Sequence, residues 1–562
     1  MSTHEVFNQA EALADVNLWR LNLPLQAGLR AWHPAFDAAG FDALGAEVGS
    51  SAMQQHARLA NHNQPQLLTH SSAGHRLDEV EFHPSYHALM SAALRHGLHG
   101  SPWSGAPGSH VERAAAFMLF TELEPSVLCP VSMTYAVTPT LRANAALHAE
   151  FGPRLAGRAY EARLAPPATK STLTMGMGMT EKQGGSDVRA NTTRAEFEGH
   201  DDWGQRWRIT GHKWFLSAPM CDAFLVLART DGASGGTARA SSQGLSCFFL
   251  PRVLGDGKLN ALRIQRLKHK LGNQANASSE VEFEGATAWL VGEPGRGVAQ
   301  ILEMGALTRL DCALGSAGLM RQALSIAIHH TRQREAFGRA LAAQPLMKNV
   351  LADLALESEA ATLLALRLAR TVDRTEHSQD ADGFEALMRR VLTPVAKFWI
   401  CKRGASFAQE AMECLGGNGY VEEQGRGVMA RIYREMPVNS IWEGSGNIMA
   451  LDLLRALRGG GVAEALLHES AAARRAHPAV ARLADGVAHR LAGAVDESDA
   501  RRLARDVALL AQAAQLCAIS PEPVFATFCD ARIAQGSDAF GMLGAGAPID
   551  ELIARAMPGA NS

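Results

Sequence analysis

The stretch GHKWFLSAPMCDAFLVLA, residues 211–228, decides the fold, because its β-rich runs lie between two regions of helical spacing. The short β-rich runs, separated by Gly, Asp and Asn, are WRIT (207–210), AFLVLART (223–230), LSCFFL (245–250) and VEFE (281–284). They predict a small all-β segment between about 180 and 290. Strands and helices do not alternate along the chain, which disfavours a doubly wound sheet with a Rossmann cofactor site.

Helical spacing surrounds this segment on both sides. Apolar positions recur at helical intervals in four stretches, namely 83–97, 110–125, 349–370 and 394–417. The run Gly459 to Gly461 ends the last helix of the bundle and resembles a junction. We therefore predict a multidomain α+β chain with a helical N-terminal domain (1–178), a central β domain (179–290), a helical bundle (291–460) and an additional helical C-terminal domain (461–562).

Composition excludes several classes of protein. The chain has 562 residues, 47% of them apolar, with 54 Lys and Arg against 57 Asp and Glu. Disordered and collagen-like chains do not have this composition. No run reaches the roughly 18 uninterrupted apolar residues of a membrane helix, and the first twenty residues lack the pattern of an export signal. We expect no membrane contact and a cytoplasmic location.

A metal site is not expected. The eight cysteines are scattered without a CxxC pair, no HExxH occurs, and the adjacent His329 and His330 point in different directions on a helix. The sequence GASGG (232–236) fits GxSxG, but it lies in polar sequence before another strand, so a flexible hairpin loop explains it better than a nucleophile elbow. The surrounding loop, 231–243, has no function that we can assign.

Two further segments carry polar groups suited to chemistry. MGMTEKQGGSDV (177–188) offers hydroxyls and backbone N–H groups that suit phosphate or a flat heterocycle, although an ordinary turn explains it equally well. In MPVNSIWEGSGNIMALDLLRALR (436–458), Glu443 lies beside Trp442, where a dry pocket would raise its pKa towards that of a general base. Alternatively, Glu443 is an ordinary first-turn glutamate stabilised by the dipole of a helix capped by Ser445 or Asn447.

These segments resemble, in order, the flavin-binding blocks of the acyl-CoA dehydrogenase family, together with RQREAFGRALAAQ (332–344) and LGGNGY (415–420). TRLDCALGS (308–316) and REMPVNSIWEGSGNIM (434–449) are similar to the family's AidB-like branch of alkylation-response flavoproteins. The resemblance covers nearly the whole chain. It implies an acyl-CoA dehydrogenase-like fold, an FAD cofactor and a homotetramer arranged as a dimer of dimers.

The resemblance also implies roles for single residues. Glu443 falls at the position of the catalytic base. The residues implied to hold FAD are Met179, Thr180, Ser186, Phe215, Ser217, Arg334, Phe337, Gln344, Gly416, Gly417, Trp442, Ser445 and Asn447. Among them, Arg334, Phe337 and Gln344 would reach the FAD of a neighbouring subunit, although the interval from Phe337 to Gln344 is one residue shorter than the common family pattern.

The implied chemistry is α,β-dehydrogenation of an acyl-CoA thioester. It needs a base for the α proton, donors for the developing enolate oxygen and a flavin that accepts the β hydride. A second solution in the family places the glutamate on an earlier helix, directly before an arginine. That position is Thr308 here, ahead of Arg309. Glu443 is therefore the remaining candidate.

The C-terminal segment gives a mixed signal about nucleic acid. Residues 463–562 hold nine arginines against twelve acidic residues, a net charge of −3, and no lysine. Arg501, Arg502 and Arg505 cluster within one helical turn and suit phosphate oxygens, but a solvated face balanced by nearby acids explains them as well. The AidB-like resemblance implies duplex DNA binding by this region, extended by Arg455 and Arg458.

Three functions follow from these observations. The first is an FAD-containing AidB-like protein that binds double-stranded DNA without sequence specificity, protects it during the adaptive response to alkylation, and retains isovaleryl-CoA-like dehydrogenase activity. The second is a metabolic dehydrogenase for short or branched acyl-CoA without a DNA role. The third is a non-enzymatic module that shields DNA and holds a structural flavin.

Overall fold

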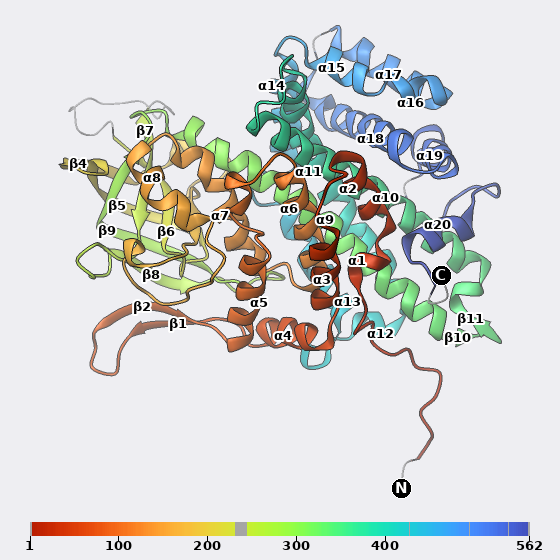
Figure 1. Ribbon diagram of the computed structural model, residues 1–562, viewed down its shortest axis with the longest axis horizontal. Helices are drawn as coiled ribbons and strands as arrows, with labels where there is room; N and C mark the ends of the chain where they lie inside the picture. The colour runs from red at the N-terminus through yellow and green to blue at the C-terminus, as the bar shows by residue number, and fades with distance from the viewer. Residues whose placement is uncertain (1–2, 231–243, 426, 494, 538, 560–562) are drawn as a thin grey trace. The chain divides into compact units, whose positions relative to one another are not determined.

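The structure of the protein is a computed structural model that describes residues 3–559 except 231–243, 426, 494 and 538. The predicted loop at 231–243 and its GASGG sequence therefore lie outside the described residues. Figure 1 shows the elements coloured along the chain. Two compact units emerge, each assembled from separate parts of the sequence. Unit 1 comprises Met1–Gln54, Ala106–Leu123 and Arg309–Ser562, and unit 2 comprises Gln55–Gly105 and Glu124–Thr308.

Unit 2 contains, in its described part, a seven-stranded sheet. The strands are β3 (Met175–Gly178), β4 (Arg194–Asp201), β5 (Gly204–Ser217), β6 (Ala223–Arg229), β7 (Leu245–Pro251), β8 (Leu262–Leu267) and β9 (Ser278–Val291). Their order is β3-β6-β4-β5-β9-β7, with β8 on β9, and a further β6–β7 pairing closes a ring of five strands. β6 and β7 are almost wholly buried, which explains their continuous apolar sequence. The four predicted β runs fall within β5, β6, β7 and β9, so these predictions are confirmed.

Helices and a hairpin complete unit 2. The helices are α4 (Ser51–His62, from residue 55 onward), α5 (Pro84–Arg95), α7 (Leu128–Leu141), α8 (Ala145–Leu155) and the first turns of α9 (Gly297–Gln333). The hairpin pairs β1 (Gln66–His70) with β2 (Arg76–Glu81) inside the N-terminal region that we predicted to be helical. Its strands are short and only partly buried, so their apolar pattern is weak.

Unit 1 is mainly helical. Its helices are α1 (Leu18–Leu21), α2 (Leu23–Trp32), α3 (Ala38–Val48), α6 (Ser109–Leu123), the rest of α9, α10 (Pro345–Glu376), α11 (Phe384–Glu413), α12 (Gly417–Tyr420), α13 (Val428–Glu435), α14 (Gly446–Leu457), α15 (Val462–Glu469), α16 (Ala471–Ala476), α17 (Pro478–Leu491), α18 (Ala500–Ile519), α19 (Glu522–Phe528) and α20 (Ile549–Ala556). The predicted helices at 110–125 and 349–370 are confirmed. The helix predicted to begin at Pro394 begins ten residues earlier, and Pro394 lies inside it. None of the described helices is long and apolar enough to cross a bilayer.

Helix α10 buries charged side chains that pair with residues far along the chain. Arg532 contacts both Asp353 and Glu357, and its Nε lies 2.8 Å from Glu357 Oε2. Burial alone raises the pKa of the Glu357 carboxyl, but Arg403 and Arg532 hold it at about 2. Arg555 pairs with Glu359 at 2.8 Å in the same way.

Arg367 of the same helix makes two further pairs. Arg367, which is fully buried, donates to Glu469 and to Glu385, each at 2.6 Å. Helices α18 and α20 also pack on α10. No boundary between compact units falls at residue 461, so the C-terminal helices are part of the same unit as the bundle.

A buried ion pair also anchors the loop after β3 in unit 2. Glu181 and Lys213 have fully buried side chains, and Nζ of Lys213 lies 2.7 Å from Glu181 Oε1 and 2.8 Å from the Leu227 carbonyl. The N–H groups of Thr192 and Thr193 also donate to Glu181. Burial alone raises the pKa of Glu181, but Lys213 and these donors hold it at about 2. The pair ties the loop to β5 and to the start of β4.

Replacing Arg532 by methionine should destabilise unit 1 strongly. The substitution leaves the buried Asp353 without its guanidinium partner, and breaking a buried pair on one side costs about 3–5 kcal/mol. Urea denaturation measures the loss. Arg482→Met is the matched control, since Arg482 is exposed on α17, and it should cost less than about 0.5 kcal/mol. Equal losses in the two variants would contradict a structural role for Arg532.

Replacing Glu181 by glutamine should destabilise unit 2 in a pH-dependent way. The pKa of Glu181 is about 2 in the folded protein and about 4.3 in an unfolded chain. Its charge therefore contributes stability in full above about pH 5, and this contribution is lost as the pH falls through the folded pKa. Unfolding midpoints between pH 7 and pH 3 should show a wild-type advantage that shrinks with acid.

The control for this variant is Glu181→Gln combined with Lys213→Met, which removes both charges. It should recover part of the stability at neutral pH, because no unpaired ammonium stays buried. An advantage of the wild type that is independent of pH would show that the ion pair does not act as described.

Candidate functional site

The predicted site residues fall into both compact units, and each unit is described by itself. Glu443, Trp442, Ser445, Asn447, Arg334, Phe337, Gln344, Gly416 and Gly417 belong to unit 1, whereas Met179, Thr180, Ser186, Phe215 and Ser217 belong to unit 2.

Glu443 has an unusual backbone conformation. Its φ angle is +58°, and Gly444 follows with φ +107°. A Cβ on Gly444 would lie 2.7 Å from the terminal methyl of Met449, and the positive φ of this residue is a conformation that favours glycine. A non-glycine residue in the left-handed region costs roughly 1–3 kcal/mol and persists only where its surroundings fix it.

Two cations fix this turn. Arg309 of α9 donates from Nε to the Glu443 carbonyl at 2.9 Å, and Lys397 of α11 donates to the Gly444 carbonyl at 2.7 Å. Asp452 of α14 holds Arg309 in turn at 3.1 Å. Lys397 is buried. The turn that carries the half-buried Glu443 is therefore bound directly to α9 and α11, and α14 holds Arg309 through Asp452.

The neighbouring residues give a mixed result for helix capping. Ser445 occupies the N-cap position of α14, as one prediction has it, but its side chain makes no capping hydrogen bond. Asn447 lies in the first turn and is exposed. Its Oδ1 accepts a hydrogen bond from Arg501 of α18 at 3.2 Å. Asn447, which is predicted to bind FAD, thus contacts Arg501, which is predicted to bind DNA. Trp442 donates from its indole to Asn439 at 3.1 Å.

The alternative position for the base carries no carboxyl group. Thr308 is buried in α9, and its hydroxyl donates to the Gly305 carbonyl at 3.1 Å. Nothing at that residue can accept a proton from a substrate.

The segment predicted to reach a neighbouring subunit forms a small hairpin. Strands β10 (Glu335–Ala336) and β11 (Arg339–Ala340) pair, and Phe337 at the tip is 99% exposed with φ +54°. Gln344 precedes α10 and donates to the Ala336 carbonyl at 3.0 Å. The Arg334 guanidinium contacts the Asn8 carbonyl. Phe337 is therefore presented to solvent or to another molecule.

The glycine pair after α11 is equally open. Gly416 has φ +61°, and no atom lies within 4 Å of a Cβ built on Gly416 or on Gly417. Both residues are exposed at the start of α12. The backbone there is accessible for the adenosine contact that the resemblance implies.

In unit 2, the loop after β3 lies against β5. The Trp214 N–H donates to the Thr180 carbonyl at 2.8 Å, and Asn191 donates to the Met179 carbonyl at 2.9 Å. Next to Trp214, the Phe215 side chain is 47% exposed. Nζ of Lys268 lies 4.7 Å from the centre of the Phe215 ring, and the exposed part of the ring offers a flat surface on which a heterocycle can stack.

The hydroxyl groups of this region are available. Within the described part of the chain, no group hydrogen-bonds to the hydroxyls of Thr180, Ser186 or Ser217. Three open hydroxyls beside an exposed aromatic ring suit a flavin and its phosphates. The residues present in unit 2 therefore fit FAD.

Sequence reasoning missed the charged residues that support these positions. Arg309, Lys397 and Asp452 hold the turn at Glu443, and Glu181 and Lys213 anchor the loop after β3. Lys397 does carry a local signal, because it is a lone cation in the apolar run PVAKFWI. A buried charge in such a run needs a polar partner.

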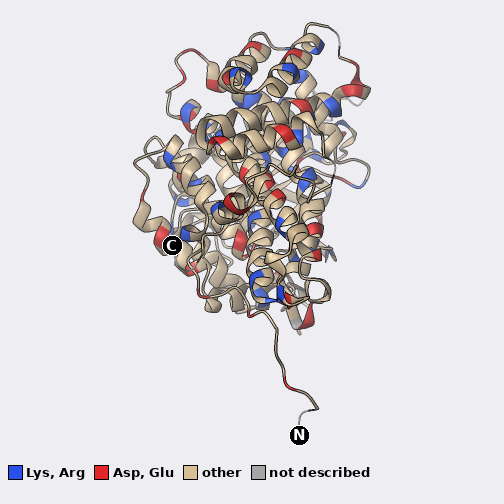
Figure 2. Ribbon diagram, turned by 90° about the vertical axis from the view of Figure 1, so that its right-hand side faces the viewer, with Lys and Arg blue, Asp and Glu red and all other residues tan. Residues whose placement is uncertain are grey.

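Of the five arginines predicted for DNA, Arg455 lies on α14, Arg458 directly follows it, and the other three lie on α18, which packs on α14. All five are exposed. Arg502 and Arg505 lie near carboxylates, with Arg502 3.9 Å from Asp499 and Arg505 2.8 Å from Asp506. Figure 2 shows basic and acidic segments interspersed along the ribbon. Across the described residues, no group of three or more His, Cys, Asp or Glu side chains could hold a metal ion.

Comparison with known proteins gives the family. Residues 8–162 match the adaptive response protein AidB N-terminal domain, residues 176–286 the acyl-CoA dehydrogenase middle domain, and residues 295–458 the acyl-CoA dehydrogenase C-terminal domain. The chain is 49% identical to AidB of Escherichia coli (strain K12) over 461 residues, which cover 81% of this chain and 80% of that protein.

Solved structures agree with this result. The crystal structure of Caenorhabditis elegans ACDH-11 in complex with C11-CoA has a TM-score of 0.84 and 28% identity, and the match covers 95% of this chain and 94% of that one. An acyl-CoA dehydrogenase complexed with FAD from Bacillus anthracis shares the fold, with a TM-score of 0.60, 17% identity and coverage of 92% and 82%. The chain therefore belongs to the acyl-CoA dehydrogenase family, in the branch that carries an AidB N-terminal domain, and its cofactor is FAD.

Proposed function

We propose that the protein dehydrogenates a short or branched acyl-CoA with Glu443 as its base, that it retains isovaleryl-CoA-like activity, and that it also binds double-stranded DNA and protects it during the adaptive response to alkylation. The observation that carries the enzymatic part is the turn at Glu443, where two cations hold a strained backbone around a half-buried carboxylate. Strain of this kind clusters at functional sites.

The carboxylate of Glu443 takes the α proton of the thioester. Gly444 has no side chain that would crowd the carboxylate. The hydrogen bonds from Arg309 and Lys397 hold the backbone of the turn, so the base is positioned before the substrate binds. FAD, when bound, supplies the acceptor for the hydride that leaves the β carbon. The fixed Glu443 N–H is the protein's donor for the enolate oxygen in this proposal.

A tetramer is part of the proposal. Several large apolar side chains of unit 1 are exposed, among them Phe337 (99%), Leu346 (83%), Tyr420 (78%) and Ile441 (64%). Exposed apolar groups of this size suit contacts between subunits. Phe337 belongs to the segment that is proposed to reach the FAD of a neighbouring subunit.

Support for DNA binding comes from the five exposed arginines on or directly after two packed helices, α14 and α18. Guanidinium groups without a base-reading element favour phosphate contacts, which carry no sequence information. The same contact region includes Asn447, through Arg501. A DNA surface here would adjoin the segment that carries the base.

Glu443→Gln should slow dehydrogenation strongly while leaving the flavin bound. A general base contributes about 10²- to 10⁴-fold to a rate, so bleaching of the flavin by isovaleryl-CoA should slow by that factor with unchanged FAD absorbance. Glu464→Gln, an exposed glutamate of α15, is the matched control. Bleaching by Glu443→Gln at the wild-type rate would place the base elsewhere, and no bleaching by the wild type would favour the non-enzymatic alternative.

Duplex DNA affinity should fall steeply with salt. Arg455→Gln with Arg458→Gln should weaken binding and reduce the salt slope by about one for each phosphate that an arginine no longer neutralises. Fluorescence anisotropy with duplexes of unrelated sequence measures both the affinity and the slope. Arg482→Gln is the control, and Glu443→Gln should bind DNA like the wild type.

Point variants are preferable to deletion of 463–562, because deletion strips the buried α10 carboxylates of Arg532 and Arg555. Absence of DNA binding at low salt would favour the metabolic alternative.

A further inference from the structure

Residues 3–16 of unit 1, which precede α1, form an N-terminal arm without helix or strand. In Figure 1 the arm runs as an extended segment from the N-terminus. Its hydrogen bonds reach the end of α9 and strand β10, which opens the hairpin that carries Phe337 at its tip. The arm therefore contacts a segment that is proposed to bind FAD, although none of the residues predicted for FAD belongs to the arm itself.

The side chain of Asn8 pairs with the main chain of the hairpin. Its Nδ2 donates to the Glu335 carbonyl at 2.9 Å, and its Oδ1 accepts a hydrogen bond from the Glu335 N–H at 2.7 Å. Two residues that face each other in an antiparallel ladder exchange bonds in the same way. The Asn8 amide thus covers the free edge of β10, as a neighbouring strand would.

The backbone of Asn8 fits this role. Its φ angle is +53°, a left-handed conformation that asparagine adopts more readily than most other non-glycine residues. In this conformation the Asn8 carbonyl accepts a hydrogen bond from the guanidinium of Arg334, the residue before Glu335. One residue of the arm therefore holds both the main chain of the hairpin and the side chain of Arg334.

A second contact fixes the arm three residues further on. The Glu11 N–H donates to Oε1 of Gln333 at 3.0 Å, and Nε2 of His329 donates to the Glu11 carbonyl at 3.0 Å. Both partners lie in the last turns of α9, directly before Arg334. The arm is thus bound on both sides of the residues that it positions.

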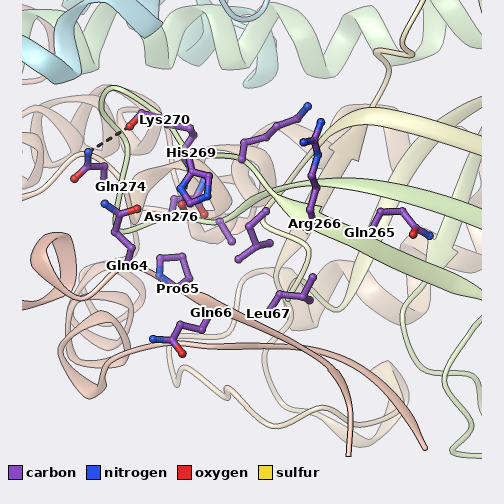
Figure 3. Close-up of a pocket in the computed structure, with 13 residues that line it drawn as sticks. Gln64, Pro65, Gln66, Leu67, Gln265, Arg266, His269, Lys270, Gln274 and Asn276 are labelled. Atoms are coloured by element: carbon purple, nitrogen blue, oxygen red, sulfur yellow. Dashed lines mark hydrogen bonds between the residues drawn. The ribbon is translucent and has the colours of Figure 1, made fainter. Parts of the chain in front are cut away.

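Arg334 keeps N–H groups for a ligand. Among the described residues, its guanidinium hydrogen-bonds to the Asn8 carbonyl alone. The basic side chains that line a cavity of about 390 Å³ in unit 2 differ in this respect (Figure 3). There Arg266 and Lys268 lie 2.7 Å and 2.5 Å from the same carboxylate, that of Glu280. A guanidinium has five N–H donors in a planar fork that suits phosphate oxygens, so Arg334 can bind an anion while Asn8 orients it.

We propose that Asn8 is a positioning residue for FAD, because it holds Arg334 in the orientation that binds the phosphate groups of the cofactor. The inference rests on the proposed role of Arg334 at the FAD of a neighbouring subunit, and it adds the N-terminal arm to the cofactor site. A side chain that is oriented before its ligand arrives loses less conformational entropy on binding. Asn8 acts on FAD affinity through Arg334 and touches no reacting group.

The test measures FAD release from the full-length holoenzyme. Samples are diluted, and free FAD is followed by its fluorescence to give the dissociation constant. Asn8→Gly keeps the left-handed conformation but removes both side-chain hydrogen bonds. It should raise the FAD dissociation constant about tenfold, the effect of losing the equivalent of one to two hydrogen bonds. Glu5→Gln, an exposed residue of the same arm, is the matched control and should bind FAD like the wild type.

A double-mutant cycle separates positioning from a general structural effect. Arg334→Gln should weaken FAD binding by itself. In that background, Asn8→Gly should change the dissociation constant by less than about twofold, because the residue through which it acts is already lost. A merely structural role of Asn8 would weaken FAD binding equally in both backgrounds. Light scattering on the same samples should show one oligomeric state for all variants.

Three results would overturn the proposal. The first is wild-type FAD affinity in Asn8→Gly, and the second is an equal loss of affinity with and without Arg334. The third is a change of oligomeric state in Asn8→Gly, since the loss of FAD would then follow from disassembly. Bleaching by isovaleryl-CoA is measured separately. A wild type that is not bleached but shows the expected FAD affinities would contradict the proposed enzymatic function and leave the role of Asn8 intact.

Discussion

Buried charge on α10 is the constraint on which unit 1 depends. Asp353, Glu357, Glu359 and Arg367 lie in the interior, where an unpaired charge costs several kcal/mol. Three long-range partners, Arg532, Arg555 and Glu469, come from beyond residue 461. The bundle therefore cannot bury this helix without the C-terminal helices, which explains why both fall in one compact unit. The helical bundle and the segment after residue 461 are therefore joined by ion pairs as well as by apolar packing.

This joint extends to the proposed active site. Helix α18 packs on α10, α11 and α14, the helix that follows Glu443. Arg501 contacts Asn447 and lies 5.7 Å from the Phe398 ring of α11. Lys397, the residue before Phe398, holds the Gly444 carbonyl. The C-terminal segment thus shares its supports with the turn at Glu443, so the proposed DNA surface at α14 and α18 and the proposed acyl-CoA site at Glu443 would be neighbouring parts of one framework.

Local pattern predicted four of the strands, β5, β6, β7 and β9, and the helices α5, α6 and α10, because apolar periodicity follows burial. It failed for Pro394, which lies inside α11 although proline disfavours a helix interior, and for the exposed β1–β2 hairpin. The motifs predicted roles for Glu443 and for the loop after β3, but not the residues that hold them. Arg309 is 134 residues from Glu443, and Lys397 is 47 residues from Gly444. Such pairings depend on tertiary contacts that no local pattern contains.

At Glu443, the left-handed backbone conformation lowers the stability of the fold, whereas the proposed role as a base requires the glutamate side chain. Glycine or asparagine adopts that conformation at lower cost, so a population selected only for a folded protein would drift away from glutamate. A population selected for turnover would keep it. The residue found at this position in related lineages is therefore a record of which property each lineage has retained, and can be read from sequence without any assay.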